Sequence, residues 1–177
     1  MISFVTMLRS AVLSLAFLPR LLHAQSVEPT CKARGSREWL QHRGSPLDSA
    51  TVVITRATAK LCYSRPSARG RAVFGGIVPF GKMWRTGANE PTVLYLTSGA
   101  EVAGVRLQPG RYLLLTVPRP ESWIIAFYTA RSDDPGEMFR TMSPVGQGRA
   151  AVEQLANPIE TFTIRSEVSR PIGVSSC

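Results

Sequence analysis

The sequence predicts a mainly β fold, an antiparallel β-sandwich of jelly-roll-like character with a long packed loop and at most one or two short helices. Short segments rich in β-branched and aromatic residues recur at regular spacing, with glycine and proline between them, which is typical of antiparallel sandwiches and barrels. The chain contains neither a glycine-rich phosphate-binding loop nor an alternation of strand and helix patterns. A parallel α/β sheet is therefore not expected.

The expected strands share side chains that alternate between apolar and polar or are apolar throughout. They cover residues 51–55, 60–63, 92–97, 111–117, 123–129 and 159–168, and a short hairpin is expected to turn near Ala103 and Gly104. Short helical segments are expected at residues 36–42 and 132–142. These elements predict an irregular N-terminal segment (25–50), one β-sandwich domain (51–168) and a C-terminal tail (169–177).

The segment from residue 64 to residue 91 differs from the rest of the chain. It is broken repeatedly by glycine and proline, yet it carries Phe74, Ile77, Phe80 and Trp84. Such a segment cannot form a long helix or strand, and its apolar side chains require burial. We therefore expect a long loop that packs on the sheet, the kind of loop that often carries function.

The first 24 residues are typical of a cleavable secretory signal. Arg9 is followed by an apolar run at residues 10–18, which is too short to span a bilayer, and Ala24 offers a small residue before Gln25. The alternative is a membrane-tethered N-terminus that is never cut. Cleavage would leave a secreted or periplasmic chain of 153 residues without a stable membrane span.

The charge balance is strongly basic. The formal net charge is +9, and it falls to +7 when residues 1–24 leave with Arg9 and Arg20. The arginines are spread along the chain instead of forming a cluster, and an exported protein rarely meets nucleic acid. A nucleic-acid partner is therefore not expected.

The three cysteines are Cys31, Cys62 and Cys177. In an oxidising compartment two of them should pair and one should remain. We favour Cys31–Cys62, which would close a loop of about 30 residues and stabilise the fold by roughly 3 kcal/mol. Cys62–Cys177 is the rival pairing.

One block of the long loop is specific enough to suggest a family. Residues 84–92 read Trp-Arg-Thr-Gly-Ala-Asn-Glu-Pro-Thr, after Phe-Gly-Gly at 74–76 and Pro-Phe-Gly at 79–81. With Trp123 and the later Glu-Thr-Phe-Thr-Ile at 160–164, the chain resembles the Domain of Unknown Function 2911 family over roughly residues 50–166. The resemblance implies a β-rich exported domain and no particular activity. Tyr128 and a C-terminus without tryptophan depart from the family pattern.

Polar side chains stand among the apolar residues of this loop and at its start. If they converge, their guanidinium groups could hold a carboxylate, a phosphate or sugar hydroxyls, and an aromatic ring could stack on a ligand. This interpretation predicts a binding module for a small polar, anionic or saccharide ligand of the cell envelope. The candidate ligand-binding residues are Tyr63, Arg65, Arg71, Trp84, Arg85, Asn89 and Glu90.

Other interpretations of the same residues stay open. Glu90 is the best candidate for a general acid or base in a carbohydrate hydrolase or lyase, although a second carboxylate is lacking. Arg85 and Glu90 could instead form a buried ion pair, Trp84 and Phe74 could be core residues, and the protein could have a purely structural role. No group of histidine, cysteine and carboxylate residues has the spacing of metal ligands, so neither a metal nor a cofactor is expected.

Overall fold

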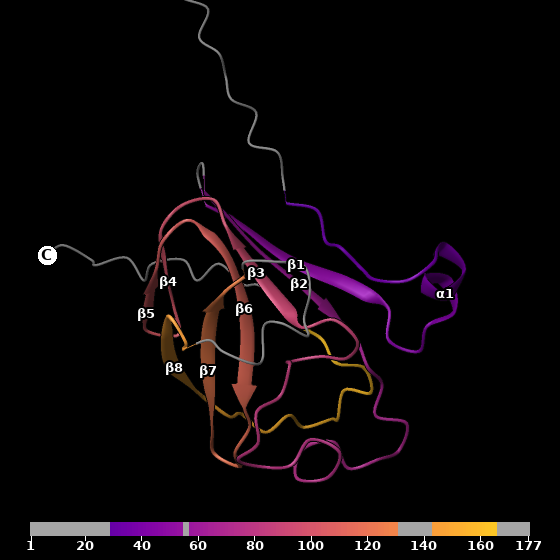
Figure 1. Cartoon of the computed structure of the whole chain (residues 1–177). Helices are drawn as coiled ribbons and strands as arrows, with labels where there is room; N and C mark the ends of the chain where they lie inside the picture. Colours follow the sequence, from indigo (N-terminus) through magenta and orange to yellow (C-terminus); the bar gives the residue numbers. More distant parts are fainter. Residues whose placement is uncertain (1–28, 55–56, 131–142, 166–177) are drawn as a thin grey trace, which may run out of the picture.

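The computed structural model describes residues 29–54, 57–130 and 143–165. A six-stranded antiparallel sheet has the order β1-β2-β3-β6-β7-β8, and a separate two-stranded sheet pairs β4 with β5 (Figure 1). The elements are α1 (Arg37–His42), β1 (Leu47–Ile54), β2 (Ala57–Ser64), β3 (Thr92–Leu96), β4 (Ala100–Val102), β5 (Val105–Leu107), β6 (Gly110–Val117), β7 (Ser122–Thr129) and β8 (Gly146–Ala151). The predicted mainly β, antiparallel fold is confirmed.

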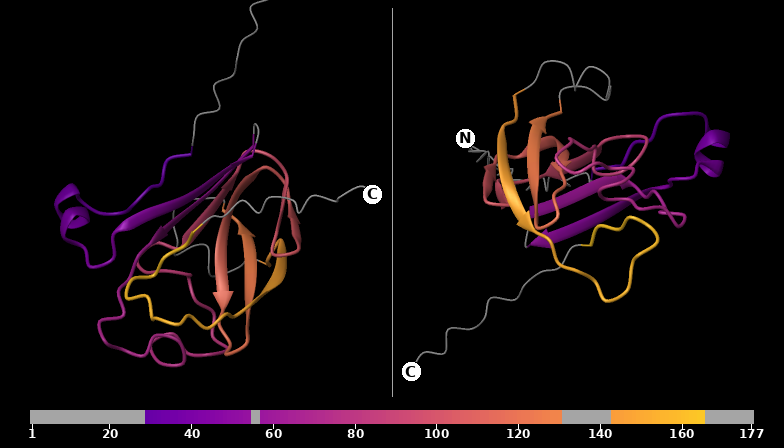
Figure 2. Two further views of the ribbon diagram at one scale, coloured as in Figure 1. Left: turned by 180° about the vertical axis from the view of Figure 1, so that it is seen from behind. Right: turned by 90° about the horizontal axis from the view of Figure 1, so that it is seen from below.

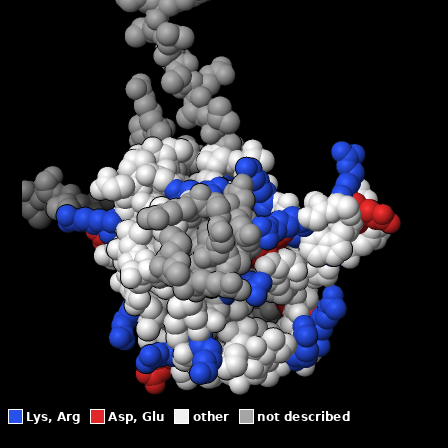
Figure 3. Space-filling view, viewed as in Figure 1, with Lys and Arg blue, Asp and Glu red and all other residues white. Residues whose placement is uncertain are grey.

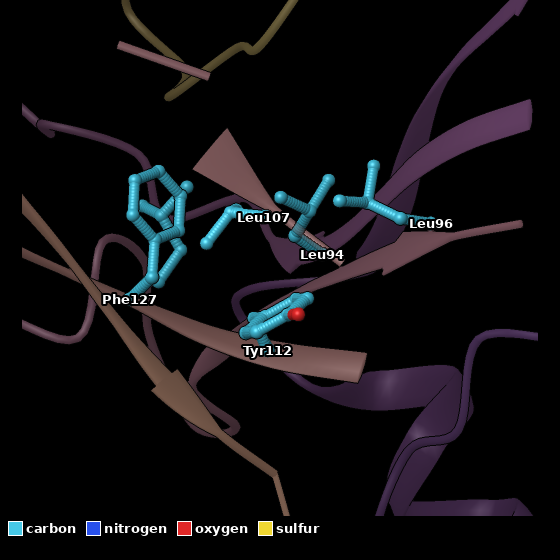
Figure 4. Packing of buried hydrophobic residues seen from close by; sticks show 6 residues of the cluster. Leu94, Leu96, Leu107, Tyr112 and Phe127 are labelled. Atoms are coloured by element: carbon cyan, nitrogen blue, oxygen red, sulfur yellow. The ribbon is translucent and has the colours of Figure 1, made fainter. Parts of the chain in front are cut away.

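One face of the large sheet carries the main core. Thr92, Leu94 and Leu96 of β3 are buried in alternation with their neighbours, because successive strand residues point to opposite faces. Figure 4 shows Leu94 and Leu96 beside Tyr112 and Phe127, which come from β6 and β7. The opposite face buries a second cluster, formed by Leu113, Leu115, Ala126 and Tyr128.

The second layer is the hairpin of β4 and β5. Leu107 joins the main core, and Ala100, Val102 and Val105 pack against it. The hairpin turns at Ala103 and Gly104, with φ of 51° and 77°, as a two-residue hairpin turn with two left-handed positions requires. The expected turn at these residues is therefore present.

Glycines in β8 allow the hairpin to come close to the edge of the large sheet. A Cβ atom on Gly148 would collide with the carbonyl oxygen of Ala103. We predict that Gly148→Ala lowers the free energy of unfolding by about 1–3 kcal/mol, the usual cost of overpacking. Gly148 does not have a positive φ, so the loss would report the contact and not backbone strain.

Gly99→Ala is the matched control for this prediction, measured in the same urea titration. Its added Cβ would meet only the Leu107 carbonyl oxygen, at an ordinary 3.6 Å. We expect a change of less than about 0.5 kcal/mol, as for most surface substitutions. Equal losses in the two variants would contradict a close approach of the hairpin to β8.

Several boundaries differ from the predicted ones. The helical segment expected at 36–42 is α1, whose Ser36 side chain accepts a hydrogen bond from the Trp39 N–H, and β1 begins at Leu47, inside the segment predicted to be irregular. The strand predicted at 159–168 is wrong over its described part, residues 159–165, where only Thr161 forms a bridge, to Ser67. The alternating pattern does not correspond to alternating burial, since Ile159 is 53% exposed and residues 161–164 are all half-buried. The backbone there pairs with the long loop, through Phe162 to Pro66 and Ala68 to Glu160. The last strand within the described residues is β8, whose sequence Gly-Gln-Gly-Arg-Ala-Ala has no strand-like pattern.

The disulfide prediction is confirmed. Cys31 and Cys62 are bonded, with their Cα atoms 5.5 Å apart. The described residues include no helix that is long and apolar enough to cross a membrane. The predicted signal (1–24), the predicted helix at 132–142, the predicted tail (169–177) and Cys177 lie outside the described residues.

Candidate functional site

The long loop between β2 and β3, residues 65–91, lies at one end of the large sheet (Figure 1). Trp84 holds it there by exchanging two backbone hydrogen bonds with Thr116 of β6, at 2.7 and 2.9 Å. The Gly81 N–H donates to the Pro118 carbonyl at 2.9 Å, which attaches a second point to the turn between β6 and β7. The loop is therefore held against the sheet, but the expected burial of its apolar side chains is only partial, since Phe74, Ile77 and Phe80 are 41%, 54% and 43% exposed.

Aromatic rings join the loop to the sheet and to the segment after β8. Trp84 makes edge-to-face contacts with Phe74, Trp123 and Phe162 at centroid distances of 5.7, 6.0 and 5.2 Å, and Phe74 also meets Trp123 at 4.7 Å. Such pairs stabilise beyond the area they bury. We call these four residues the aromatic cluster.

A groove of about 1020 Å³ opens beside the aromatic cluster. The loop 65–91 forms one wall and residues 150–163 form another. Backbone hydrogen bonds join Phe162 to Pro66 and Ala68 to Glu160, and the two segments lie side by side at the bottom of the left view of Figure 2. The lining is mainly apolar and includes all four rings of the cluster. Charged side chains that also line it are Arg71, Arg119, Glu153 and Glu160. We call this feature the aromatic groove.

The structure divides the seven predicted ligand-binding residues among three places. Arg71 and Trp84 line the aromatic groove, whereas the other five do not. Tyr63 and Arg65 meet Asp48 of β1, and Arg85, Asn89 and Glu90 lie at the end of the loop. The aromatic groove therefore brings together only two of the seven predicted residues.

One of the two places outside the groove is built around Asp48. Arg65 forms an ion pair with the Asp48 carboxylate at 3.1 Å and donates to the Phe162 carbonyl at 3.4 Å. The buried Tyr63 hydroxyl donates to Asp48 at 3.3 Å and accepts from the Ile164 N–H at 3.0 Å. Burial raises the pKa of Tyr63 above its usual 10.0, although the Ile164 hydrogen bond acts in the opposite direction. These contacts attach the segment after β8 to the sheet.

The other place outside the groove, at the end of the loop, is built around Glu90. Its carboxylate accepts hydrogen bonds from both sides: Arg43 Nη1 at 2.8 and 3.0 Å, the Ser64 hydroxyl at 2.8 Å and the Arg34 N–H at 2.9 Å. Arg43 also donates to Ser64 at 3.2 Å. The side chains of Arg43 and Glu90 are only 2% and 13% exposed. Glu90 is therefore the acid of a buried ion pair.

The pKa of Glu90 follows from these contacts. Burial alone would raise the pKa, but the hydrogen bonds from the Arg34 and Glu90 backbone N–H groups, from Ser64 and from Arg43 hold it below the usual 4.5. A general acid at neutral pH needs a raised pKa. The geometry therefore favours a structural role for this carboxylate.

The sequence interpretation that paired Glu90 with Arg85 named the wrong arginine. Arg85 donates instead to the Asn89 carbonyl at 2.7 Å, and Asn89 donates to the Ser45 carbonyl at 3.2 Å. Both contacts hold the turn at residues 85–89, where Asn89 has a φ of 58°. Arg43 is 47 residues before Glu90, and no local pattern connects the two residues.

Arg71 is held near the mouth of the groove by its own turn. It donates from Nε to the Ala68 carbonyl at 2.9 Å and from Nη2 to the Ser67 carbonyl at 3.1 Å. Arg119, which sequence reasoning did not select, makes no hydrogen bond or ion pair within the part of the chain that the structure describes. Both guanidinium groups are exposed at the groove, where they could contact an anion.

Sequence reasoning missed Trp123, Phe162 and Arg119 as groove residues. The available signal was the large apolar side chains of a loop broken by glycine and proline, but their partners on β7 and after β8 are distant in sequence. Within the described ranges, no group of three or more histidine, cysteine or acidic residues could hold a metal ion.

Comparison with known families gives one match, over residues 45–173, to the family described as Protein of unknown function (DUF2911). Comparisons with curated proteins and with solved structures found no match.

Proposed function

The chain belongs to the DUF2911 family of proteins of unknown function, and from this premise we propose that it is a ligand-binding module whose site is the aromatic groove. The observation that carries the proposal is the groove of about 1020 Å³ lined by four aromatic rings with two exposed arginines. Small-molecule sites are commonly concave, mainly apolar and supplied with a few polar groups. The groove has each of these properties.

The lining points to an amphipathic ligand. The sequence interpretation favoured a small polar, anionic or saccharide molecule, but most of the groove surface is apolar. A ligand with an apolar or ring-shaped body would lie against Trp84 and Trp123, and an anionic or hydroxyl-bearing end would face Arg71 and Arg119. The positive net charge of the chain also favours anions.

The proposed place of action is outside the cytoplasm. The Cys31–Cys62 bond supports this because disulfides persist in oxidising compartments and are rare in the cytosol. The signal-like residues 1–24 point the same way. The ligand would then be a component of the cell envelope or its surroundings.

A carbohydrate hydrolase or lyase with Glu90 as its acid or base has less support. Both oxygens of Glu90 are already engaged by Arg43 and Ser64, and the carboxylate does not line the groove. A purely structural role would leave the groove without a ligand. Binding of a fluorescent probe in the groove separates that role from ligand binding.

Anilinonaphthalene sulfonate, which joins fused rings to an anionic group, is a suitable first probe. We predict saturable binding at one site, followed by probe emission and by energy transfer from tryptophan. Ala150→Phe should weaken binding at least tenfold, because Ala150 lies opposite Trp123 on β8 and lines the groove. Replacing Arg71 and Arg119 by glutamine should weaken it about tenfold, given the usual strength of charged hydrogen bonds.

Val145→Phe is the matched control, because Val145 is exposed and does not line the groove. Its affinity for the probe should equal that of the unchanged chain. Circular dichroism must show that every variant has kept its fold, since unfolded chains also bind this probe. Equal affinity in Ala150→Phe and Val145→Phe would place the probe elsewhere and overturn the proposal.

A further inference from the structure

One stretch of the long loop exposes large apolar side chains. Ile77, Phe80 and Met83 are 54%, 43% and 53% exposed, although they lie within seven residues of each other. Scattered exposed apolar residues are normal, but a cluster marks an interaction surface. We call residues 75–83 the apolar tip.

The backbone holds the apolar tip in a defined conformation. Val78, at its centre, is buried and donates to the Val73 carbonyl at 2.8 Å, while the Gly75 N–H donates to the Val78 carbonyl at 2.9 Å. The Gly81 N–H donates to Pro118. The exposed side chains are thus presented by a packed loop.

Basic residues lie in and beside the apolar tip, although the groove next to it is also lined by Glu153 and Glu160. Lys82 is part of it, and the hydrogen bond from Gly81 to Pro118 places Arg119 next to it. Arg71 lies just before it in the chain, and Glu121 is the nearest acid along the β6–β7 turn. In Figure 3, basic side chains outnumber acidic ones along the lower edge of the molecule, where this loop lies in Figure 1.

We infer that the apolar tip docks on an anionic lipid bilayer and that the groove takes its amphipathic ligand from that surface. The inference rests on the proposed function, since it names the source and class of the ligand as lipid-like. Apolar side chains would enter the interface between headgroups and acyl chains, and the cations would meet anionic headgroups. Ile77, Phe80 and Arg119 also line the aromatic groove, so its mouth would open toward the bilayer.

Two variants test the docking. Ile77→Ser/Phe80→Ser/Met83→Ser removes the apolar side chains, and Lys82→Glu/Arg119→Glu reverses the flanking charges. Their matched controls are Val53→Ser and Arg37→Glu, at exposed positions on β1 and α1. Val53 lies near the end of β1 that is far from the long loop. The other end of β1, Leu47, pairs with Ser64, the residue after which the loop begins.

The chain is isolated after export from a bacterial host, its N-terminus is determined by mass spectrometry, and its flotation with vesicles is measured. Vesicles of phosphatidylcholine with phosphatidylglycerol should bind it at least tenfold more strongly than phosphatidylcholine alone. The triple serine variant should lose at least tenfold in affinity. The charge reversal should lower the affinity about fivefold or more for each cation and should remove most of the salt dependence of binding. Both controls should bind as the unchanged chain does.

The two proposals can fail separately. Saturable probe binding by the unchanged chain, with vesicle binding that is absent or equal in the tip variants and controls, would overturn the lipid docking and leave a protein partner for the tip. Vesicle binding that depends on the tip, with no probe binding in the groove, would overturn the proposed function and with it the transfer of a ligand. Loss of vesicle binding in the tip variants but not in the controls supports the docking; a loss of probe binding in the same variants follows directly from changing Ile77, Phe80 and Arg119, which line the groove.

Discussion

Replacing Cys31 and Cys62 by serine is expected to lower the free energy of unfolding by about 3–4 kcal/mol. The bond joins residues separated by 31 positions, and a loop of this length restricts the unfolded chain by about that amount. Cys62 is buried on β2, whereas Cys31 belongs to the segment before α1. The bond therefore attaches the N-terminal segment to the sheet.

Urea unfolding of the oxidised and the reduced chain measures this effect. Dithiothreitol should destabilise the unchanged chain and have no effect on the double serine variant, which serves as the control. The two forms of the unchanged chain should differ in the midpoint of unfolding. A midpoint that stays the same after complete reduction would show that the N-terminal segment contributes no stability through this bond.

Glu90→Gln is expected to lower the free energy of unfolding by roughly 3 kcal/mol. The change leaves the Arg43 guanidinium charged and buried without its counter-charge, and breaking a buried ion pair in this way is strongly destabilising. Glu101→Gln is the matched control, because Arg106 and Glu101 are 3.8 Å apart and both are largely exposed. Its loss should stay below about 0.5 kcal/mol, as is usual for surface pairs. Equal losses in the two variants would contradict a buried role for Glu90.

The same ion pair predicts how stability depends on pH. The pKa of Glu90 is lower in the folded chain than its ordinary value of 4.5, so its contribution is fully present above about pH 4.5 and is lost as the pH falls through the folded value. Thermal unfolding between about pH 6 and pH 2 should therefore show a steeper acid loss in the unchanged chain than in Glu90→Gln. Parallel curves would mean that Glu90 has the same pKa in the folded and unfolded chains.

A second substitution separates the ion pair from packing. Arg43→Met combined with Glu90→Leu removes both charges and keeps side chains of similar size. We expect the pair of changes to recover much of the stability lost in Glu90→Gln, since apolar replacements of buried pairs are often neutral or better. A loss equal to that of Glu90→Gln would show that the hydrogen bonds to Ser64 and Arg34 matter more than the charge.

The sequence by itself determined the local features of this protein. Alternating side chains marked the strands that became β3, β6 and β7, and glycine and proline marked the long loop and the hairpin turn. Cysteine arithmetic favoured Cys31–Cys62, and the block from Trp84 to Thr92 was specific enough to indicate the family. Each of these signals lies within a few residues or concerns residues that are rare in the chain, so each can be found without knowing the path of the backbone.

Only the tertiary structure decided which distant residues meet. Arg43 pairs with Glu90, Arg65 with Asp48, and the groove joins Trp84 to Trp123 and Phe162, although nothing local distinguishes these partners from other arginines, acids and rings. Strand β8 likewise depends on its tertiary contacts. Its sequence has no strand-like pattern, and its glycines make room for the hairpin of β4 and β5. The physical reason is that side-chain alternation specifies which face is buried, whereas a binding surface depends on how the loops cross the end of the sheet.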